Sequence, residues 1–368
     1  MVGPDTPLSL MGGVPGVGVP GGRRAENTLF RRGGRPDHVG MRRRVTAANP
    51  GAPAAAGVRM EWRAVPVAVR NLVETRLGSP VRSAVSQHAG FSPGVAARVR
   101  LADGRRVFLK AVGPEPNPDS PGMHRAEAHI TAALPATAPV PPLLMALEFE
   151  GWVVLAFEDV AGKMPAQPWQ TDQLLRVLAA AADMSALLDP SPVEAPTVAE
   201  RFGDKFQGWG RLAAAFEEHA DDLAWLDPWA RRNLGRLAEL EGGWRAAAAG
   251  RGLVHGDLRA DNVLLTEDRV IFVDWPAAAV GASRFDVIAM GPSVVMQGGQ
   301  DLIPLLDEHL DARGAPSENV TVVLVAVAGF FLHQSVQAAP PGLPTLRAFQ
   351  GAQGEAALRW LRRRTRWS

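Results

Sequence analysis

The chain has 368 residues, with 39 basic and 38 acidic side chains, a formal net charge of +1 and no cysteine. This length allows two lobes and a sizeable hydrophobic core. The lack of cysteine excludes disulfides, thiolate zinc sites and cysteine nucleophiles. Nothing long and apolar begins the chain, so we expect no signal peptide and a cytoplasmic protein.

The first 59 residues differ in composition from the rest. They are rich in Gly, Pro and Arg, and residues 1–58 carry eight arginines against three acidic residues. This composition predicts a disordered basic tail. Contact with nucleic acid or an acidic surface is one role for it; a start codon placed too early, with translation from Met60 or Met41, is the simpler reading. We expect residues 1–59 to be dispensable, followed by an N-terminal lobe (60–158) and a C-terminal lobe (159–368).

A β-hairpin is predicted over residues 98–112, around the turn Asp103-Gly104. Its second strand, VFLKAV, contains Lys110. Lysine otherwise occurs only at Lys163 and Lys205, against an abundance of arginine. A compact ammonium is therefore favoured at Lys110 over a planar guanidinium, although a surface lysine on an edge strand is the alternative.

Helical and strand periodicity continue downstream. A helix is predicted over residues 124–134 and a buried strand over 152–157, followed by a loop. Further helices are expected over residues 172–188, 206–226, 229–249, 320–331 and 345–364. The apolar run 320–331 is too short to span a bilayer and is read as a core helix. We read the basic last helix as a solvated face rather than a nucleic-acid site.

The most informative segment is HGDLRADNVLLTEDRVIFVDW, residues 255–275. A polar loop and a hairpin follow a buried strand, so Asp257, Asn262 and Asp274 fall at strand ends or in loops, open to a cleft. Asp257 can orient or accept a hydroxyl proton, and the other two offer the hard oxygen ligands that Mg²⁺ prefers. The spacing H-x-D-x-x-x-x-N is that of a kinase catalytic loop. A polar hairpin with turn-capping residues is the alternative.

These motifs resemble the aminoglycoside phosphotransferase family, small-molecule kinases of the protein-kinase-like fold. HGDLRADNVLL resembles the catalytic loop of that family and VDW its metal-binding segment. The resemblance implies an α+β, bilobal protein-kinase-like fold, with an antiparallel-sheet N-lobe and a mainly helical C-lobe. It implies that Asp257 is the catalytic base, that Asn262 and Asp274 hold Mg²⁺, and that His255 and Asp286 support the loop.

The resemblance also assigns a nucleotide site in the N-lobe. Lys110 would contact the α- and β-phosphates of ATP, and Glu127 would be its ion-pair partner. The phosphate-covering loop should be GFSPG, residues 90–94, which is not a G-x-G-x-x-G motif and alone reads as an ordinary turn. The remaining candidates, from this loop and from the main chain beside the adenine, are Ser92, Gly94, Phe157, Glu158 and Asp159.

The sequence thus predicts transfer of the γ-phosphoryl group of ATP, with Mg²⁺, to a small-molecule hydroxyl. The acceptor stays open among aminoglycoside-like antibiotics, sugars, amino alcohols and other natural products, as does a role in antibiotic resistance. An acidic cluster would suit a polycationic acceptor, but a solvated helix face is the favoured explanation of it. Its members are Glu217, Glu218, Asp221, Asp222 and Asp227.

Two alternatives remain from the sequence: a catalytically inactive nucleotide-binding regulatory protein, and a protein kinase. Against the second, only eleven residues separate Asp274 from Asp286, which leaves no room for a peptide-docking activation segment. We expect a monomer or homodimer without a nucleic-acid or membrane partner.

Overall fold

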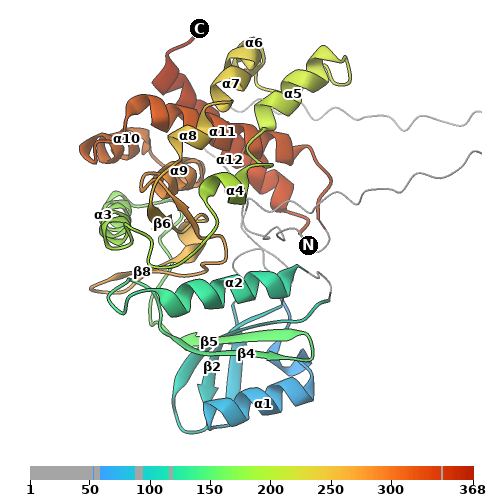
Figure 1. Cartoon of the computed structure of the whole chain (residues 1–368), viewed down its shortest axis with the longest axis vertical. Coiled ribbons are helices and arrows are strands. Elements are labelled where there is room, and N and C mark those ends of the chain that lie inside the picture. Colours follow the sequence, from blue (N-terminus) through green and yellow to red (C-terminus); the bar gives the residue numbers. More distant parts are fainter. Residues whose placement is uncertain (1–52, 54–58, 88–93, 116–118, 341–342) are drawn as a thin grey trace, which may run out of the picture.

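The computed structural model describes residues 53, 59–87, 94–115, 119–340 and 343–368. Over these ranges the chain forms two lobes, one built on a β-sheet and one built mainly of helices (Figure 1). The predicted α+β bilobal kinase-like architecture is confirmed. The predicted basic tail lies outside the described residues, apart from its last residue, Arg59, and Pro53.

The N-lobe contains a five-stranded antiparallel sheet in the order β1-β2-β3-β5-β4. Lys110 lies on β3, where it pairs with Ala96 on one side and Leu155 on the other. The alternative that Lys110 is on an edge strand is therefore wrong. The strands are β1 (Val81–Ser86), β2 (Val95–Leu101), β3 (Arg106–Val112), β4 (Leu143–Phe149) and β5 (Trp152–Glu158).

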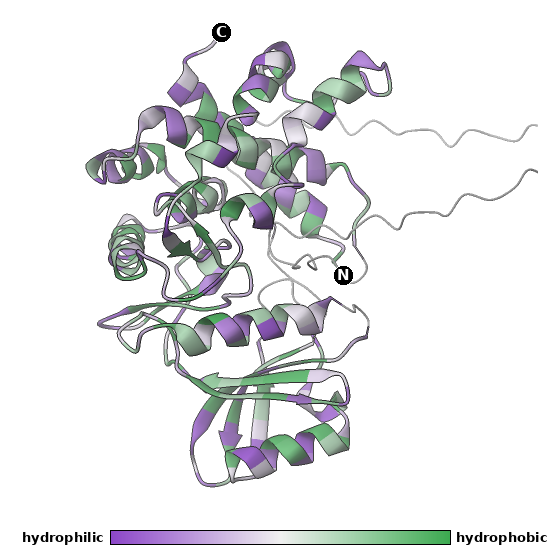
Figure 2. Cartoon of the chain, viewed as in Figure 1, coloured by the Kyte–Doolittle hydropathy of each residue, from purple (hydrophilic) through white to green (hydrophobic). Residues whose placement is uncertain are grey.

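Two helices pack on this sheet. Helix α1 (Val67–Leu77) shares a hydrophobic cluster with strands β2 and β3, whereas α2 (Ser120–Ala133) packs through Ala128 on a second cluster formed by β5. Figure 1 shows the two helices on opposite sides of the sheet, with α2 facing the C-lobe. Figure 2 shows the hydrophobic character of β5, whose residues 153–157 are all buried. Helix α2 begins earlier than predicted because Pro121 is tolerated in a first turn.

The C-lobe is mainly helical, as predicted. Its helices are α3 (Thr171–Leu187), α4 (Val198–Phe202), α5 (Gly208–Glu217), α6 (Pro228–Arg232), α7 (Leu234–Glu241), α8 (Trp244–Ala247), α9 (Phe285–Gln297), α10 (Ile303–Ala312), α11 (Ser317–Ser335) and α12 (Leu346–Thr365). Helix α11 is long and apolar enough to cross a membrane by length and composition, yet 67% of it is buried inside the protein. It packs against α5, α7, α9 and α12, so its interpretation as a core helix is confirmed.

Two predicted helices were too long. Within residues 206–226, which were predicted as one helix, α5 ends at Glu217. His219 and Leu223 have φ values of 56° and 52°, which lie outside the helical region. The segment predicted as 229–249 is divided into α6, α7 and α8. Asn233 interrupts it first, and the glycine pair 242–243 interrupts it again before α8.

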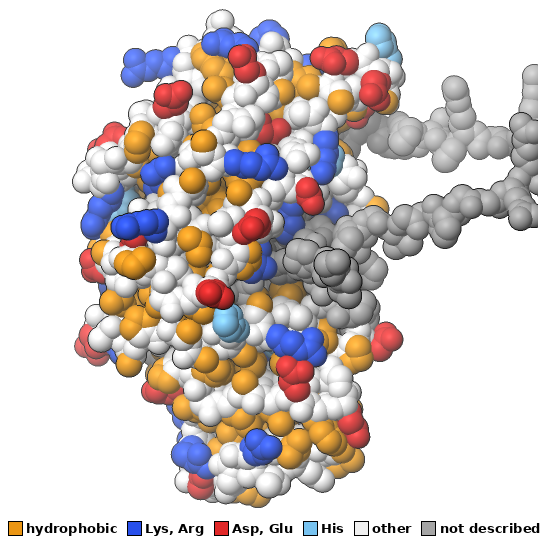
Figure 3. Space-filling view, in the orientation of Figure 1, with side chains coloured by type: hydrophobic (Ala, Val, Ile, Leu, Met, Phe, Trp, Pro, Cys, Tyr) orange, Lys and Arg blue, Asp and Glu red, His pale blue; other side chains and the backbone are white. Residues whose placement is uncertain are grey.

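Charged side chains of both signs are interspersed on the face shown in Figure 3. The three arginines in the last turn of α12 each form an ion pair with a carboxylate of the same chain. Arg363 lies 2.6 Å from Asp301. The other two pairs are Arg362 with Asp227 and Arg364 with Asp307. The basic end of the chain is thus engaged in intramolecular ion pairs.

Four short strands carry the catalytic motif. Strand β6 (Gly252–Val254) pairs with β9 (Ala279–Gly281), and β7 (Val263–Leu265) pairs with β8 (Val270–Phe272). The second pair is the hairpin predicted from the sequence, closed by a hydrogen bond from Thr266 N to Arg269 O of 2.9 Å. The motif is therefore held between strand ends.

Candidate active site

The loop after β6 is held by a carboxylate from α9. Asp286 is 2% exposed and accepts hydrogen bonds of 2.8 Å from both His255 N and Gly256 N. Gly256 has a φ of 77°, and a Cβ there would lie 2.3 Å from Ala277 O. A side chain at this position would thus combine backbone strain with a steric clash. The loop that carries Asp257 is consequently fixed in one conformation.

His255 connects this loop to the second acidic segment. Its Nε2 lies 2.9 Å from Val273 O, and its Nδ1 lies 3.2 Å from Asp257 N. Because Asp257 N can only donate and Val273 O can only accept, the proton must be on Nε2. Burial lowers the pKa of His255 despite the neighbouring Asp286 carboxylate, so the ring remains neutral at neutral pH. It holds the residues beside Asp257 and Asp274 together.

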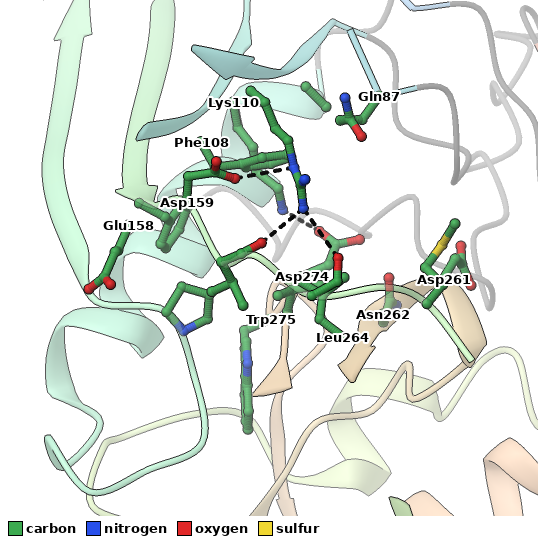
Figure 4. Close-up of a pocket in the computed structure, with 18 of the residues that line it drawn as sticks. Gln87, Phe108, Lys110, Glu158, Asp159, Asp261, Asn262, Leu264, Asp274 and Trp275 are labelled. Atoms are coloured by element: carbon green, nitrogen blue, oxygen red, sulfur yellow. Dashed lines mark hydrogen bonds and ion pairs between the residues drawn. The ribbon is translucent and has the colours of Figure 1, made fainter. Parts of the chain in front are cut away.

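Asn262 is oriented by the catalytic loop itself. Its Nδ2 donates to Asp257 O at 2.7 Å. The amide oxygen consequently faces away from the loop, and Figure 4 shows it directed into the pocket. Asn262 can thus offer an oxygen ligand to a metal ion.

Lys110 lies between two carboxylates. Its Nζ is 2.6 and 2.7 Å from the Glu127 oxygens and 2.5 Å from Asp274 Oδ1 (Figure 4). The structure thus places the sequence-predicted partner, Glu127, against Lys110. Asp274 completes the group with a φ of 70°, a conformation that Asp tolerates better than most residues.

The pKa shifts follow from this geometry. Burial alone would lower the pKa of Lys110, but the Asp274 and Glu127 carboxylates outweigh it and raise that pKa. Burial raises the pKa of Glu127, against the opposing effect of Lys110. For Asp274, burial is overcome by Lys110, which holds the pKa well below its usual range. Asp274 therefore stays ionised throughout the neutral range, as a metal ligand requires.

These residues border a pocket of about 570 Å³ between the lobes. This volume falls in the range of small-molecule and cofactor sites. The pocket is lined by the sheet, the end of β5, the catalytic loop and the segment after β8, and Lys110, Glu127, Asn262 and Asp274 all contribute. Asp257 is not among the described residues that line it. The pocket and the predicted catalytic base thus occupy adjacent positions.

The end of β5 contributes Phe157, Glu158 and Asp159 to the pocket wall. The Asp159 side chain is directed back into the N-lobe, where it lies 3.2 Å from Arg98 Nε and 2.6 Å from Arg106. Arg98 also donates to Val160 O at 2.9 Å. These contacts brace the connection between the lobes. The main chains of Phe157 and Glu158 are engaged in the sheet, where Glu158 N donates to Pro142 O at 3.0 Å.

The predicted phosphate-covering loop is only partly described. Ser92 lies outside the described residues. Gly94 has a φ of 94°, and a Cβ there would lie 2.5 Å from Ala111 O. The close approach of strand β3 is therefore sufficient to explain this glycine, and Gly94 is not among the described residues lining the pocket.

Sequence reasoning missed several charged residues of the site. Arg259 is 3% exposed, with Nε 3.6 Å from Asp257 Oδ1 and a terminal nitrogen 3.1 Å from Asp261 Oδ2. Its position inside the motif was the available signal. Arg59 lines the pocket, within the electrostatic reach of Asp274 and Asp261. A chain that started at Met60 would therefore lack a pocket-lining guanidinium.

The two lobes, the Lys110–Glu127 pair and the braced catalytic loop define a kinase-like phosphotransferase fold. The chain belongs to the phosphotransferase enzyme family, whose sequence profile matches residues 89–317, more than half of its length. A search of curated proteins found no match.

Solved structures share this fold. One is a thermostable mutant of the aminoglycoside phosphotransferase APH(4)-Ia in complex with AMP-PNP and hygromycin B, with a TM-score of 0.50 and 15% identity, covering 80% of this chain and 99% of that one. Another is the choline kinase LicA from Streptococcus pneumoniae, with a TM-score of 0.51 and 10% identity, covering 80% of this chain and 97% of that one. At these identities the likeness supports the fold alone.

Proposed function

We propose that this phosphotransferase moves the γ-phosphoryl group of ATP to a hydroxyl of a small molecule. The observation that carries the proposal is the convergence of Lys110, Glu127, Asn262 and Asp274 on one pocket, with Asp257 on the adjoining loop. The ammonium of Lys110 is suited to nucleotide phosphates. For the adenine edge, we assign the main chain at Asp159, just after the sheet-paired residues Phe157 and Glu158. An AMP-PNP complex of a structural neighbour agrees with this nucleotide class.

The donor atoms of the site fit Mg²⁺. Asn262 presents an amide oxygen and Asp274 an ionised carboxylate. No group of three or more His, Asp or Glu side chains suited to a metal ion occurs among the described residues. A hard cation that takes its remaining ligands from phosphate and water suits such a sparse protein set. When bound, Mg²⁺ would neutralise charge on the β- and γ-phosphates.

The protein groups then divide the remaining work. Asp257 would orient the acceptor hydroxyl and receive its proton as the oxygen bonds to the γ-phosphorus, while the bond from that phosphorus to the β–γ bridging oxygen breaks and ADP leaves. Arg259 Nε, 3.6 Å from Asp257 Oδ1, forms an ion pair with that carboxylate. Lys110 holds the nucleotide phosphates in position. Positioning and charge stabilisation of this kind are the main protein contributions to phosphoryl transfer.

A small acceptor is favoured over a protein substrate by the short connection after Asp274. The chain passes through β9, which pairs with β6, and enters α9 at Phe285. The segment between Asp274 and α9 is thus taken up by strand pairing next to the catalytic loop. An activation segment that docks a peptide has no chain length available here.

The test is an ATP-consumption screen with aminoglycosides, macrolides, sugars and amino alcohols, comparing the wild type with Asp257→Asn. We expect turnover with at least one acceptor class, and a loss of about 100-fold or more in the variant, which keeps the side-chain size. Nucleotide binding without turnover on every acceptor would favour the inactive regulatory protein. Transfer to casein, but not to small hydroxyl compounds, would favour a protein kinase.

A further inference from the structure

Lys205 is a buried lysine within the electrostatic reach of Asp257 on the catalytic loop. Lys205 follows α4, donates its backbone N–H to Phe202 O at 2.9 Å and is 9% exposed. Its Nζ lies 5.8 Å from the centre of the Phe202 ring. Helix α4 begins at a complete capping box formed by Thr197 and Glu200, and it packs against β9. The ammonium is thus carried by a well-anchored element next to the catalytic segment.

The described residues around Lys205 provide no salt bridge to its ammonium. Among the described residues, its Nζ has no hydrogen-bond partner. The charged groups that act on it are Arg201, which lies on α4, and Asp257. Burial, together with Arg201, lowers the pKa of Lys205 to about 7 against the opposing effect of Asp257. Asp257 itself lies near Arg259 at 3.6 Å, so that one carboxylate faces more than one cation.

Arg201 adds a second unsatisfied donor. One of its terminal nitrogens donates to Ala278 O at 3.2 Å, which fixes the side chain against the segment between Asp274 and β9. Its Nε has no hydrogen-bond partner among the described residues. Buried polar groups in folded proteins normally have partners, and those that do not indicate water, an ion or a ligand. Two such donors, one of them within the electrostatic reach of Asp257, point to an anion.

We propose that Lys205, assisted by Arg201, binds an anionic group of the acceptor, so that the substrate is a hydroxyl compound bearing a carboxylate or a phosphate. This inference rests on the proposed phosphotransferase function and specifies its acceptor. An ammonium and a guanidinium attract such a group and repel a polycation. The acidic cluster that would suit a polycation is located elsewhere: Figure 1 places the end of α5 at the outer end of the C-lobe, away from the N-lobe.

The scarcity of lysine gives a direct test. Lys110, Lys163 and Lys205 are the only lysines, so full-length protein labelled with an NMR-active carbon at lysine Cε gives few signals, which single substitutions assign. Gluconate and glycerate serve as anionic probes, with glucose and glycerol as neutral counterparts and kanamycin as a polycation. We expect gluconate or glycerate to raise the titration midpoint of the Lys205 signal by about one pH unit, a tenfold shift in its proton affinity, and the neutral compounds to leave it unchanged.

Other outcomes separate the two proposals. An equal response to neutral and anionic probes, or none to any anion, would overturn the assignment of Lys205. The Lys110 signal provides the independent readout, because it should respond to MgATP whatever the acceptor is. A silent Lys110 signal would instead count against the proposed phosphotransferase function.

Kinetics with matched variants complete the test. For an anionic acceptor, Lys205→Met should raise the acceptor KM by about 10- to 100-fold, as expected for loss of a hydrogen bond to a charged group, with the KM for ATP unchanged. Lys205→Arg should recover part of the affinity. Arg313→Met, at an exposed position after α10, is the control. A uniform fall in kcat on all acceptors, with acceptor KM unchanged, would show that Lys205 only supports the fold around Asp257.

Discussion

The half-buried Lys110 and the buried Lys205, both close to residues of the catalytic segment, differ in their partners. Lys110 has Glu127 and Asp274 within 2.7 Å, whereas Lys205 has no hydrogen-bonded partner among the described residues. Burial opposes the charge of both, but carboxylates raise the pKa of Lys110, while that of Lys205 is lowered to about 7. The ammonium of Lys110 is held in place by carboxylates of the protein. The ammonium of Lys205 has no such partner and is therefore suited to bind an anionic ligand.

The largest expected effect concerns the carboxylates next to these lysines. Asp257→Ala should reduce turnover by about 100- to 10,000-fold, the usual contribution of a general base, and spare most MgATP binding. Asp274→Ala should weaken both, because it removes a metal ligand and a partner of Lys110. Turnover assays and calorimetric nucleotide titration separate the two variants. Similar activity of Asp257→Ala and the wild type would contradict the assigned division of roles.

Removing the ammonium of Lys110 should destabilise the N-lobe. Lys110→Met leaves Glu127 and Asp274 without their shared cation, and loss of one partner of a buried ion pair costs about 3–5 kcal/mol. Urea unfolding measures the loss. The double variant Lys110→Met with Glu127→Gln is the control. Its loss should be smaller than the sum of the losses of the two single variants, because one of the two carboxylates left without the cation is also neutralised. Fully additive losses would show that the pair is not coupled.

The conformation of the catalytic loop depends on Asp286. Asp286→Ala leaves the N–H groups of His255 and Gly256 without their acceptor, at about 1–3 kcal/mol for each buried donor. Asp286→Asn retains one oxygen and should lose less stability. Both the midpoint of thermal unfolding and kcat should be highest for the wild type, lower for Asp286→Asn and lowest for Asp286→Ala. If the Ala variant matched the wild type in both, Asp286 would not brace the loop.

The two lysines should affect the pH dependence of stability in opposite directions. The pKa of Lys205 falls from 10.5 to about 7 on folding, so between these values the unfolded chain binds more protons, and stability rises with pH. The pKa of Lys110 is raised above 10.5, so its contribution is complete below that pH and is lost above it. Chemical unfolding between pH 6 and 9 measures how the free energy of unfolding rises with pH. This rise should be shallower in Lys205→Met than in the wild type, by about the contribution of one titrating group. An unchanged slope would mean that Lys205 titrates normally.

The smallest effect is expected at the acidic cluster. Glu217 and Glu218 are exposed at the end of α5, and Asp221 and Asp222 accept hydrogen bonds from nearby backbone N–H groups. Glu217→Gln with Glu218→Gln should change stability by less than about 0.5 kcal/mol, as for other surface substitutions, and leave acceptor KM unchanged. A selective loss of aminoglycoside phosphorylation would restore the cluster as an acceptor site and contradict an anionic acceptor.

The sequence was sufficient to predict the parts of the fold that depend on local pattern. The Asp-Gly hairpin, the hairpin after Asn262 and the apolar core helix α11 were all anticipated from turn chemistry and periodicity. Helix breaks after Glu217 and at Asn233 were not, because they depend on backbone conformations that amphipathic spacing does not encode. The two-lobe organisation came from motif resemblance rather than from periodicity.

For the site, residues inside motifs were easier to find than residues brought in from elsewhere. Lys110 and Asp274 are far apart in sequence, and only folding shows that they are in contact. Lys205 belongs to no motif, and its rarity as a lysine was its only sequence signal. Its burial beside Asp257 is a tertiary property.

The most direct test of the central claim is to follow the γ-phosphoryl group itself. Wild type and Asp257→Ala are incubated with MgATP labelled at the γ-phosphate and with hydroxy acids, sugars, amino alcohols and aminoglycosides, and the products are identified by mass spectrometry. We predict label on a small-molecule hydroxyl with the wild type and none with the variant. Label found only on protein or in inorganic phosphate, or equally on the acceptor with both proteins, would contradict it.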